Sequence, residues 1–355
     1  MTNELWDTII AGQGIAGTTL AWHLVEAGQR VLLVDAEASV TASKIAAGLI
    51  TPITGLRLTL SEQVGTFLPV ARDFYTRIET LTGQHFFHPR TAVRLFQTDD
   101  ERRTFAQRSA QLEFQEHLAS PQPNPLLDSH LADVSGKGFA MHAAQLDVAA
   151  YLAASRAHLP YTAMSIDWRQ DVTFDADTVT VQGHRTRLLI SCEGYAATRN
   201  PYFSDVQFQA AKGDILTVRF DQPMPPLCLH RGIWLAPTAD AHIFRAGSTY
   251  DLVKLDDLPS QAARGEIENK LRAFIRIPFT VLDHQAAVRP IIRQSQALIG
   301  LHPTQPRLGF FNGLGSKGAL NAPWYAQCLT EFLVHGTPIP DASNVRTHLA
   351  HAARH

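Results

Sequence analysis

Apolar residues change their spacing twice near the start of the chain. Residues 7–11 form a short apolar run, which is typical of a buried strand and leads directly into a glycine-rich turn. In residues 15–27 the apolar side chains recur every four positions, as in a helix packed on a sheet. Residues 31–34 form a second buried strand. The pattern predicts a β-α-β unit with both strand ends at one edge of a parallel sheet.

Similar patterns predict the later elements. The predicted helices cover 61–83, the first part of a polar, proline-containing stretch at 99–128, 147–159, and a final amphipathic helix ending near Val334. The predicted strands cover 92–96, 172–181, 187–191, 215–220, 233–236 and 243–246. No internal repeat interrupts this order.

The turn after the first strand has the spacing G-x-G-x-x-G at Gly12, Gly14 and Gly17. Gly12 permits the tight turn, Gly14 lets the backbone approach a pyrophosphate, and Gly17 lets the helix lie close to the strand. The N-terminus of the helix favours an anion at this position. Asp35 follows the second strand, where a carboxylate can bind ribose hydroxyls. Together these features predict a dinucleotide site, without separating NAD from FAD.

Three further segments carry candidate chemistry. Residues 46–52 (AAGLITP) are small enough to let the backbone lie against a flat ring, although a tight packed loop is the alternative. Arg289 precedes a proline and would offer a planar, two-pronged donor to a carboxylate; a surface salt bridge is its commoner role. Residues 313–318 (GLGSKG) form a second glycine-rich loop before a helix.

In order and spacing, these motifs resemble the D-amino-acid oxidase family of flavoproteins, which includes glycine oxidase and sarcosine oxidase. The resemblance rests on the N-terminal glycine loop, AAGL with Pro52, Arg289-Pro290 and the late glycine loop. It implies FAD as cofactor and oxidation of the C–N bond of a small amine or amino acid to an imine, which water hydrolyses. Hydrogen peroxide would follow if the enzyme is an oxidase.

The resemblance also implies roles for individual residues. The predicted FAD contacts follow the chain order Gly12, Gly14, Ile15, Ala16, Gly17, Asp35, Ala36, Ser43, Lys44, Ala47, Gly48, Leu49, Gly194, Gly313, Gly315, Ser316, Lys317 and Gly318. Arg289 corresponds to the arginine that binds the substrate carboxylate, and Tyr250 is a candidate substrate-facing residue. Lys317 departs from the family, whose late loop commonly carries histidine or tyrosine. It would stabilise charge on the reduced flavin ring, bind the FAD phosphates or point to solvent.

The implied fold class is α/β, α+β overall, with a Rossmann-type FAD-binding domain and an interleaved antiparallel-sheet substrate domain. We expect the FAD-binding domain to comprise residues 1–60, 145–211 and 291–355. The substrate domain would then comprise residues 61–144 and 212–290.

Composition narrows the setting. Hydrophobic residues make up 45% and charged residues 18%, with a formal net charge of -2, so nothing predicts a nucleic-acid partner. The N-terminus does not have the pattern of a signal peptide, and no apolar run is long enough to span a membrane. We therefore expect a soluble cytoplasmic protein. Oligomeric state is not predicted.

Cysteine and histidine spacing predicts no metal site and no disulfide scaffold. The three cysteines, Cys192, Cys228 and Cys328, are far apart. The 16 histidines are scattered, and we expect His88 and His230, like His284, to be ordinary core or surface residues.

Four alternatives stay open at this point. The tRNA wobble-uridine modification oxidase belongs to the same flavoprotein family and also acts on a secondary amine. An FAD dehydrogenase would pass its electrons to an acceptor other than oxygen. An NAD-dependent dehydrogenase and a non-enzymatic flavin-binding protein are the remaining two.

Overall fold

The N-terminal β-α-β unit has the predicted layout. In the computed structural model, which describes residues 4–55, 57–120, 129–131, 138–292 and 296–352, it consists of β1 (Leu5–Ala11), α1 (Ile15–Glu26) and β2 (Val31–Asp35). β1 pairs in parallel with β2 on one side and with β12 (His184–Ser191) on the other. The carboxyl ends of these strands therefore meet at one edge, where α1 begins.

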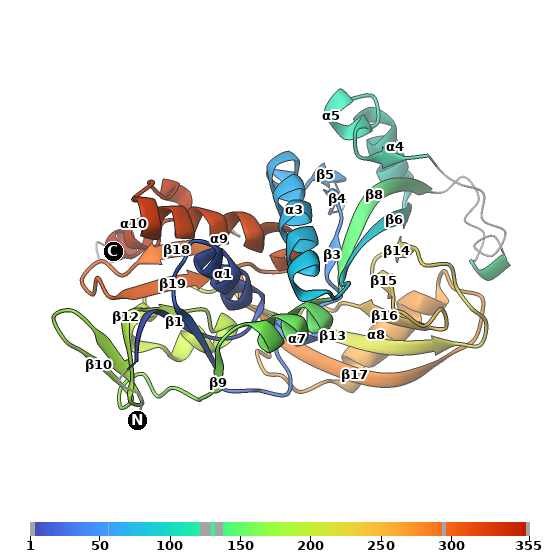
Figure 1. The fold of residues 1–355 in the computed structure, drawn as a ribbon. Coiled ribbons are helices and arrows are strands. Elements are labelled where there is room, and N and C mark those ends of the chain that lie inside the picture. Colours follow the sequence, from blue (N-terminus) through green and yellow to red (C-terminus); the bar gives the residue numbers. More distant parts are fainter. Residues whose placement is uncertain (1–3, 56, 121–128, 132–137, 293–295, 353–355) are drawn as a thin grey trace.

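A first, mixed sheet is built around this unit. Its order is β10-β11-β12-β1-β2-β9, and β19 pairs with β12 and β18 (Figure 1). The remaining strands are β9 (Tyr161–Ala163), β10 (Val172–Phe174), β11 (Val179–Val181), β18 (Leu298–Leu301) and β19 (Leu308–Asn312). Segments from both ends and the middle of the chain thus lie side by side.

A second sheet holds most of the remaining strands, in the order β17-β13-β16-β15-β14-β6-β8-β3, with β7 beside β8. All its pairs are antiparallel except β14–β6. Its strands are β3 (Leu49–Ile50), β6 (Phe87–Leu95), β7 (Leu118–Ala119), β8 (Gly138–Leu146), β13 (Ala211–Phe220), β14 (Cys228–His230), β15 (Trp234–Pro237), β16 (Ile243–Gly247) and β17 (Phe279–Arg289). A small separate pair joins β4 (Ile53–Thr54) to β5 (Thr59–Leu60).

Helices cover both sheets. α9 (Gly318–His335) packs against α1 and α3 (Val64–Thr82), and α7 (Val148–His158) also contacts α1 and α3 (Figure 1). These helices share a large buried apolar cluster with the first sheet. α8 (Gln261–Arg272) packs on β13 and β16 of the second sheet.

The other helical segments are short or peripheral. They are α2 (Ala42–Ile45), α4 (Asp99–Arg108), α5 (Leu112–Gln115), α10 (Val345–Ala352) and the 3-10 turns η1 (Gly194–Arg199), η2 (Pro201–Phe203) and η4 (Asp341–Ser343).

Two predicted elements differ from the structure. The single strand expected at 172–181 is a hairpin of β10 and β11, because the chain reverses at Asp175, whose N–H donates to the carbonyl of Thr178 at 2.8 Å. In the stretch 99–128, α4 is followed by α5 and β7, and residues 121–128 lie outside the described part. β8, β18, β19 and α8 were not predicted.

The boundaries expected between the FAD-binding domain and the substrate domain stay a prediction.

The chain first enters the second sheet early, because β3 pairs with β8 (Leu49 opposite Gln145). This early crossing puts residues just after Asp35 between the two sheets, where the site described next lies.

Candidate active site

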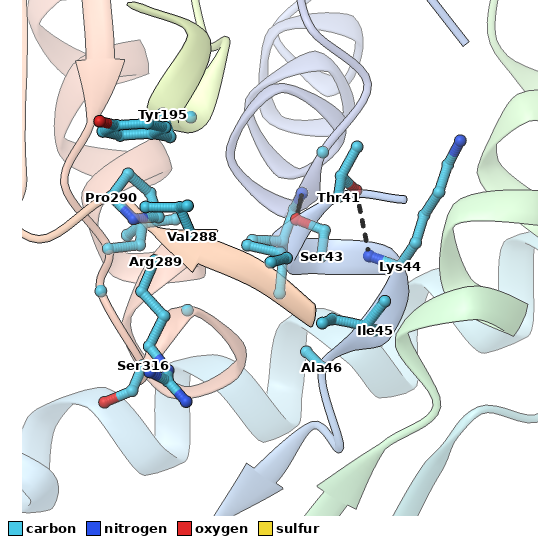
Figure 2. A pocket seen from close by; sticks show the side chains of 18 of the residues that line it. Thr41, Ser43, Lys44, Ile45, Ala46, Tyr195, Val288, Arg289, Pro290 and Ser316 are labelled. Atoms are coloured by element: carbon cyan, nitrogen blue, oxygen red, sulfur yellow. Dashed lines mark hydrogen bonds between the residues drawn. The ribbon is translucent and has the colours of Figure 1, made fainter. Parts of the chain in front are cut away.

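A cavity of about 1420 Å³ runs between the two sheets. Ordinary small-molecule pockets measure about 300–1,000 Å³, so this one has room for a dinucleotide together with a substrate. The turn after β1 and Asp35 lie in its wall, as do Arg289 at the end of β17 and Tyr250 in the loop after β16. Figure 2 shows Arg289 and Ser316 on one side of the pocket and Thr41, Ser43 and Lys44 on the other.

All the predicted site residues line this cavity except Gly17 and Gly313. A Cβ on Gly17 would lie 2.0 Å from the carbonyl oxygen of Gly12, so its absence lets α1 approach β1. A Cβ on Gly313 would lie 2.5 Å from Ile292. Both glycines therefore shape the walls from behind, and direct contact with a cofactor by either one stays a prediction.

The N-terminus of α1 faces the cavity from the glycine turn. Gly12 has a φ of 106°, a conformation that favours glycine, and a Cβ there would lie 2.5 Å from the carbonyl oxygen of Cys192. The Ser43 hydroxyl accepts the N–H of Ile15 at 3.0 Å, and Thr41 accepts the N–H of Lys44 at 3.2 Å (Figure 2). Backbone donors and hydroxyls thus surround the place where a pyrophosphate would bind.

Asp35 is held in a fixed orientation at the end of β2. Its carboxylate accepts the N–H of Gln13 at 2.7 Å and that of Glu37 at 2.8 Å. Arg156 braces the same corner, donating to Gln13 at 2.8 Å and to Glu37 at 2.7 Å. A carboxylate oriented in this way fits the predicted contact with ribose hydroxyls.

Residues 45–49 are fixed to the second sheet by their carbonyl groups. Arg245 donates to the carbonyls of Ala46, at 2.9 Å, and of Ile45. Gln145 donates to the carbonyl of Ala47 at 3.2 Å. Gly48 has a φ of 66°, and a Cβ there would lie 1.8 Å from the carbonyl oxygen of Leu146. This part of the wall is therefore smooth, rigid backbone, as a flat ring requires.

Arg289 is placed by the ends of β16 and β17. Its Nη2 donates to the Ser248 hydroxyl and to the carbonyl of Thr249, the latter at 3.3 Å. The guanidinium lies 5.5 Å from the centre of the Tyr250 ring. A Cβ on Gly213 would lie 1.9 Å from Nη2, so glycine there makes room for the arginine.

The second terminal nitrogen of Arg289 is ready for a ligand. Nη1 is buried and has no hydrogen-bond partner among the described residues. Burial lowers the pKa of the guanidinium from its usual high value, and Tyr250 and Asp214 oppose that shift. A buried cation with an unpaired donor fits a carboxylate ligand.

The late glycine loop closes the cavity at the start of α9. The Asn312 side chain accepts the N–H of Gly313 at 2.8 Å and donates to the carbonyl of Gly194 at 2.8 Å, which ties this loop to the end of β12. Lys317 is the N-cap of α9 and is partly buried in the cavity wall. Burial lowers the pKa of its ammonium, against the opposing charge of Glu62.

Several wall residues were not predicted. Glu193 accepts the Ser191 hydroxyl at 2.7 Å and the Trp168 indole N–H at 3.0 Å, and burial raises the pKa of its carboxyl. Arg94 and His230 also line the cavity, from the second sheet. In the sequence, Arg94 and His230 are isolated residues on two distant strands, and only the strand register brings them together.

Three further features concern the described part of the chain: metal sites, disulfides and membrane-spanning helices. Within it, no three or more histidine, cysteine, aspartate or glutamate side chains gather where they could hold a metal ion. The three cysteines are free thiols. None of the described helices has both the length and the apolar character needed to cross a membrane.

Known proteins share this architecture. The structure of glycine oxidase from Bacillus cereus superposes with a TM-score of 0.76 and 16% sequence identity, covering 94% of this chain and 96% of that one. Glycine oxidase from Geobacillus kaustophilus superposes with a TM-score of 0.75 and 18% sequence identity, covering 95% of this chain and 96% of that one. Iminodiacetate oxidase from Chelativorans superposes with a TM-score of 0.71 and 18% sequence identity, covering 94% of this chain and 97% of that one. At these identities the likeness shows a shared fold.

The sequence itself gives the family. The family model for FAD-dependent oxidoreductases, DAO, matches residues 7–332, which include the glycine loop, Asp35, Arg289 and the late loop before α9. FAD fits the cavity by its volume, by its glycine-lined turn and by the oriented Asp35 carboxylate beside that turn. The chain therefore belongs to the DAO family of FAD-dependent oxidoreductases and is an enzyme that uses FAD.

Proposed function

We propose that this enzyme oxidises the C–N bond of a small amine or amino acid that carries a carboxylate, giving an imine that water hydrolyses. The observation that carries the proposal is Arg289, whose Nη1 is buried and unpaired among the described residues in the wall of the cofactor cavity. Glycine oxidase and iminodiacetate oxidase, which share the fold, are named for amines that carry carboxylates. Family membership removes the NAD-dependent and non-enzymatic alternatives.

The protein's own residues bind and orient the substrate. FAD, when bound, supplies the capacity to accept a hydride from the carbon beside the amine nitrogen. Arg289 would hold the carboxylate through Nη1, while Ser248 and Thr249 fix its other nitrogen. Tyr250 would cover the guanidinium face. Such positioning is the main contribution that a protein makes to hydride transfer.

Lys317 and the backbone at residues 46–49 would hold the reacting end of the cofactor. Lys317 lies in the cavity wall at the start of α9, together with Gly318 and Ala319. Positive charge and helix N-termini stabilise negative charge that develops during a reaction. We propose this electrostatic role for Lys317 because its side chain is partly buried in the cavity wall.

Arg289 substitutions test the carboxylate contact. Removing one partner of a buried charged pair costs about 2–5 kcal/mol, so we expect Arg289→Ala to lower kcat/KM for an amino acid by about 30-fold or more. Arg289→Lys keeps the charge but loses the two-pronged geometry and should recover only part of the activity. Arg219→Ala is the matched control, because Arg219 lies on β13 with an exposed side chain.

The comparison also needs an amine without a carboxylate. We expect Arg289→Ala to leave turnover of such an amine nearly unchanged, and to keep the FAD content of the wild type. Equal losses for both amines, or no loss for either, would overturn the carboxylate contact. Oxygen consumption measured beside dye reduction then separates an oxidase from a dehydrogenase that uses another acceptor.

A tRNA substrate is the alternative with a different partner. Its modified uridine also carries a secondary amine, but the net charge of -2 gives no electrostatic support for binding a polyanion. A gel-shift titration with tRNA at moderate salt distinguishes the two: tRNA retention would favour the alternative.

A further inference from the structure

A second polar cluster lies in the cavity wall, away from Arg289. Arg94 of β6 is the cross-strand partner of His230 of β14, which in turn faces Trp234 of β15. Directly opposed residues on neighbouring strands project from the same face of a sheet. Arg94, His230 and Trp234 all line the cavity, so this row of side chains forms one wall of it.

The strand order separates this cluster from Arg289. The Arg289 guanidinium is bound to Ser248 and Thr249, just beyond the end of β16. In the sheet, β15 lies between β16 and the His230 strand, β14. Neighbouring strands are about 4.8 Å apart, so β14 lies about 10 Å from β16 across the sheet, and β6 with Arg94 lies one strand further. A molecule that reaches both must be longer than glycine.

Arg94 carries a charge that is already balanced. Its Nε and Nη2 donate to one oxygen of Glu101, at 2.8 and 2.5 Å, while the other oxygen accepts the N–H of Gln97 at 2.8 Å. The two side chains are only 3% and 4% exposed. The ion pair therefore brings no net charge to the wall.

His230 has an unused hydrogen-bonding atom beside this pair. Its Nδ1 is buried and lacks a partner among the described residues. Burial, together with the nearby Arg94 cation, lowers the pKa of His230 to about 4, so the ring is neutral near pH 7. A neutral imidazole offers one donor and one acceptor, and leaving either buried without a partner is unfavourable.

We propose that Arg94 and His230, with Glu101 neutralising Arg94, form a subsite for an uncharged, hydrogen-bonding group at the far end of the substrate. The substrate would then be an amino acid or related amine whose extended side chain ends in an amide, ureido or hydroxyl group. A charged end is disfavoured, because a buried ion needs a counter-charge and Arg94 and Glu101 already neutralise each other. This inference rests on the proposed function, with the carboxylate at Arg289.

Anaerobic flavin reduction tests the subsite. The probes are four amino acids of similar length, each as both enantiomers: citrulline (ureido end), norleucine (apolar), 2-aminoadipate (anionic) and lysine (cationic). We expect citrulline to reduce the flavin with the highest ratio of rate constant to dissociation constant. Its advantage over norleucine should be about tenfold or more, as expected for a hydrogen bond made in a buried site.

Variants at His230 assign the preference to this residue. We expect His230→Phe to lower the ratio of rate constant to dissociation constant for citrulline by about 5- to 100-fold. The same ratio for norleucine should change by less than about twofold. His230→Gln retains hydrogen-bonding groups and should recover part of the loss. The control is His142→Phe, since His142 lies exposed on β8 and outside the cavity wall. FAD content is measured for each protein to confirm folding.

The outcomes separate the subsite from the reaction. If norleucine or glycine reduces the wild-type flavin as well as citrulline does, the subsite is overturned and the proposed function stands. An equal loss for citrulline and norleucine in His230→Phe also overturns it, because the residue would then be structural. If no amine reduces the flavin, both proposals are overturned.

Discussion

Arg289 depends on a neighbour that has no side chain. The guanidinium occupies the space that a Cβ on Gly213 would fill, at 1.9 Å. The sequence predicted Arg289 through its RP motif, but it gave no sign of this role for Gly213, which lies on a different strand and is brought close only by the pairing of β13 with β17. His230 was likewise expected to be ordinary, because its neighbour Arg94 is distant in the sequence.

Asp35 provides a prediction at the same scale. Its carboxylate is oriented by two backbone N–H groups and faces the cavity, so we expect Asp35→Ala to weaken FAD binding by about 10- to 150-fold, the range for hydrogen bonds to a charged group. Fluorescence titration of the apoprotein with FAD measures the dissociation constant. Asp73→Ala is the control, because that side chain is 76% exposed. An unchanged dissociation constant in Asp35→Ala would count against the ribose contact.

At the scale of elements, the local sequence pattern was sufficient to predict helices and strands that pack against their neighbours in the sequence. The β1-α1-β2 unit was predicted nearly to its ends because a strand, a glycine turn and a helix are adjacent in sequence. β8 was not predicted, and its pairing with β3 and β6 joins segments far apart. The cavity wall at Gly48 depends on that pairing, so only its small residues could be anticipated.

A pair of glycine substitutions measures the contact between residues 46–49 and β8. Gly48 and Gly28 both have positive φ, at 66° and 81°, so alanine is strained at either position by about 1–2 kcal/mol. Only at Gly48 would the new Cβ meet a backbone atom, at 1.8 Å, whereas nothing lies within 4 Å of Gly28. We expect Gly48→Ala to lower the free energy of unfolding by about 1–3 kcal/mol more than Gly28→Ala, as urea unfolding would show. Equal losses would contradict the close packing.

The contact between α1 and α3 should respond to pH. His23 of α1 stacks on Phe74 of α3 at 4.9 Å, and burial lowers the pKa of His23 to about 4 from 6.5. Between those values the unfolded chain binds a proton that the folded protein does not. Stability should therefore fall as the pH drops from 6.5 towards 4, by up to about 1.4 kcal/mol per pH unit.

His23→Phe isolates this effect because it keeps an aromatic ring and removes the proton site. We expect its unfolding free energy to depend less steeply on pH over that range, measured by urea unfolding at several pH values. His142→Phe, at an exposed position, should keep the slope of the wild type. An unchanged slope in His23→Phe would mean that His23 titrates alike in the folded and unfolded chain.

At the scale of the whole molecule, the site is assembled from distant parts of the sequence. The cavity wall includes Gly12 near the start, Arg289 at the end of β17, Tyr250 in the loop after β16, and Lys317 near the end. The order of the motifs was enough to predict the family and its cofactor, because each motif is local. The substrate could not be read from the sequence, since its pocket depends on which strand faces lie opposite one another.

The most direct measurement of the central claim is anaerobic absorbance of the bound FAD during titration with candidate substrates. We predict that the purified protein carries FAD and that its oxidised band is bleached by one or more carboxylate-bearing amines, with formation of the matching carbonyl product. Glycerol 3-phosphate is the control, because a glycerophosphate oxidase shares the fold (TM-score 0.70). Bleaching by the alcohol and by none of the amines would contradict the account.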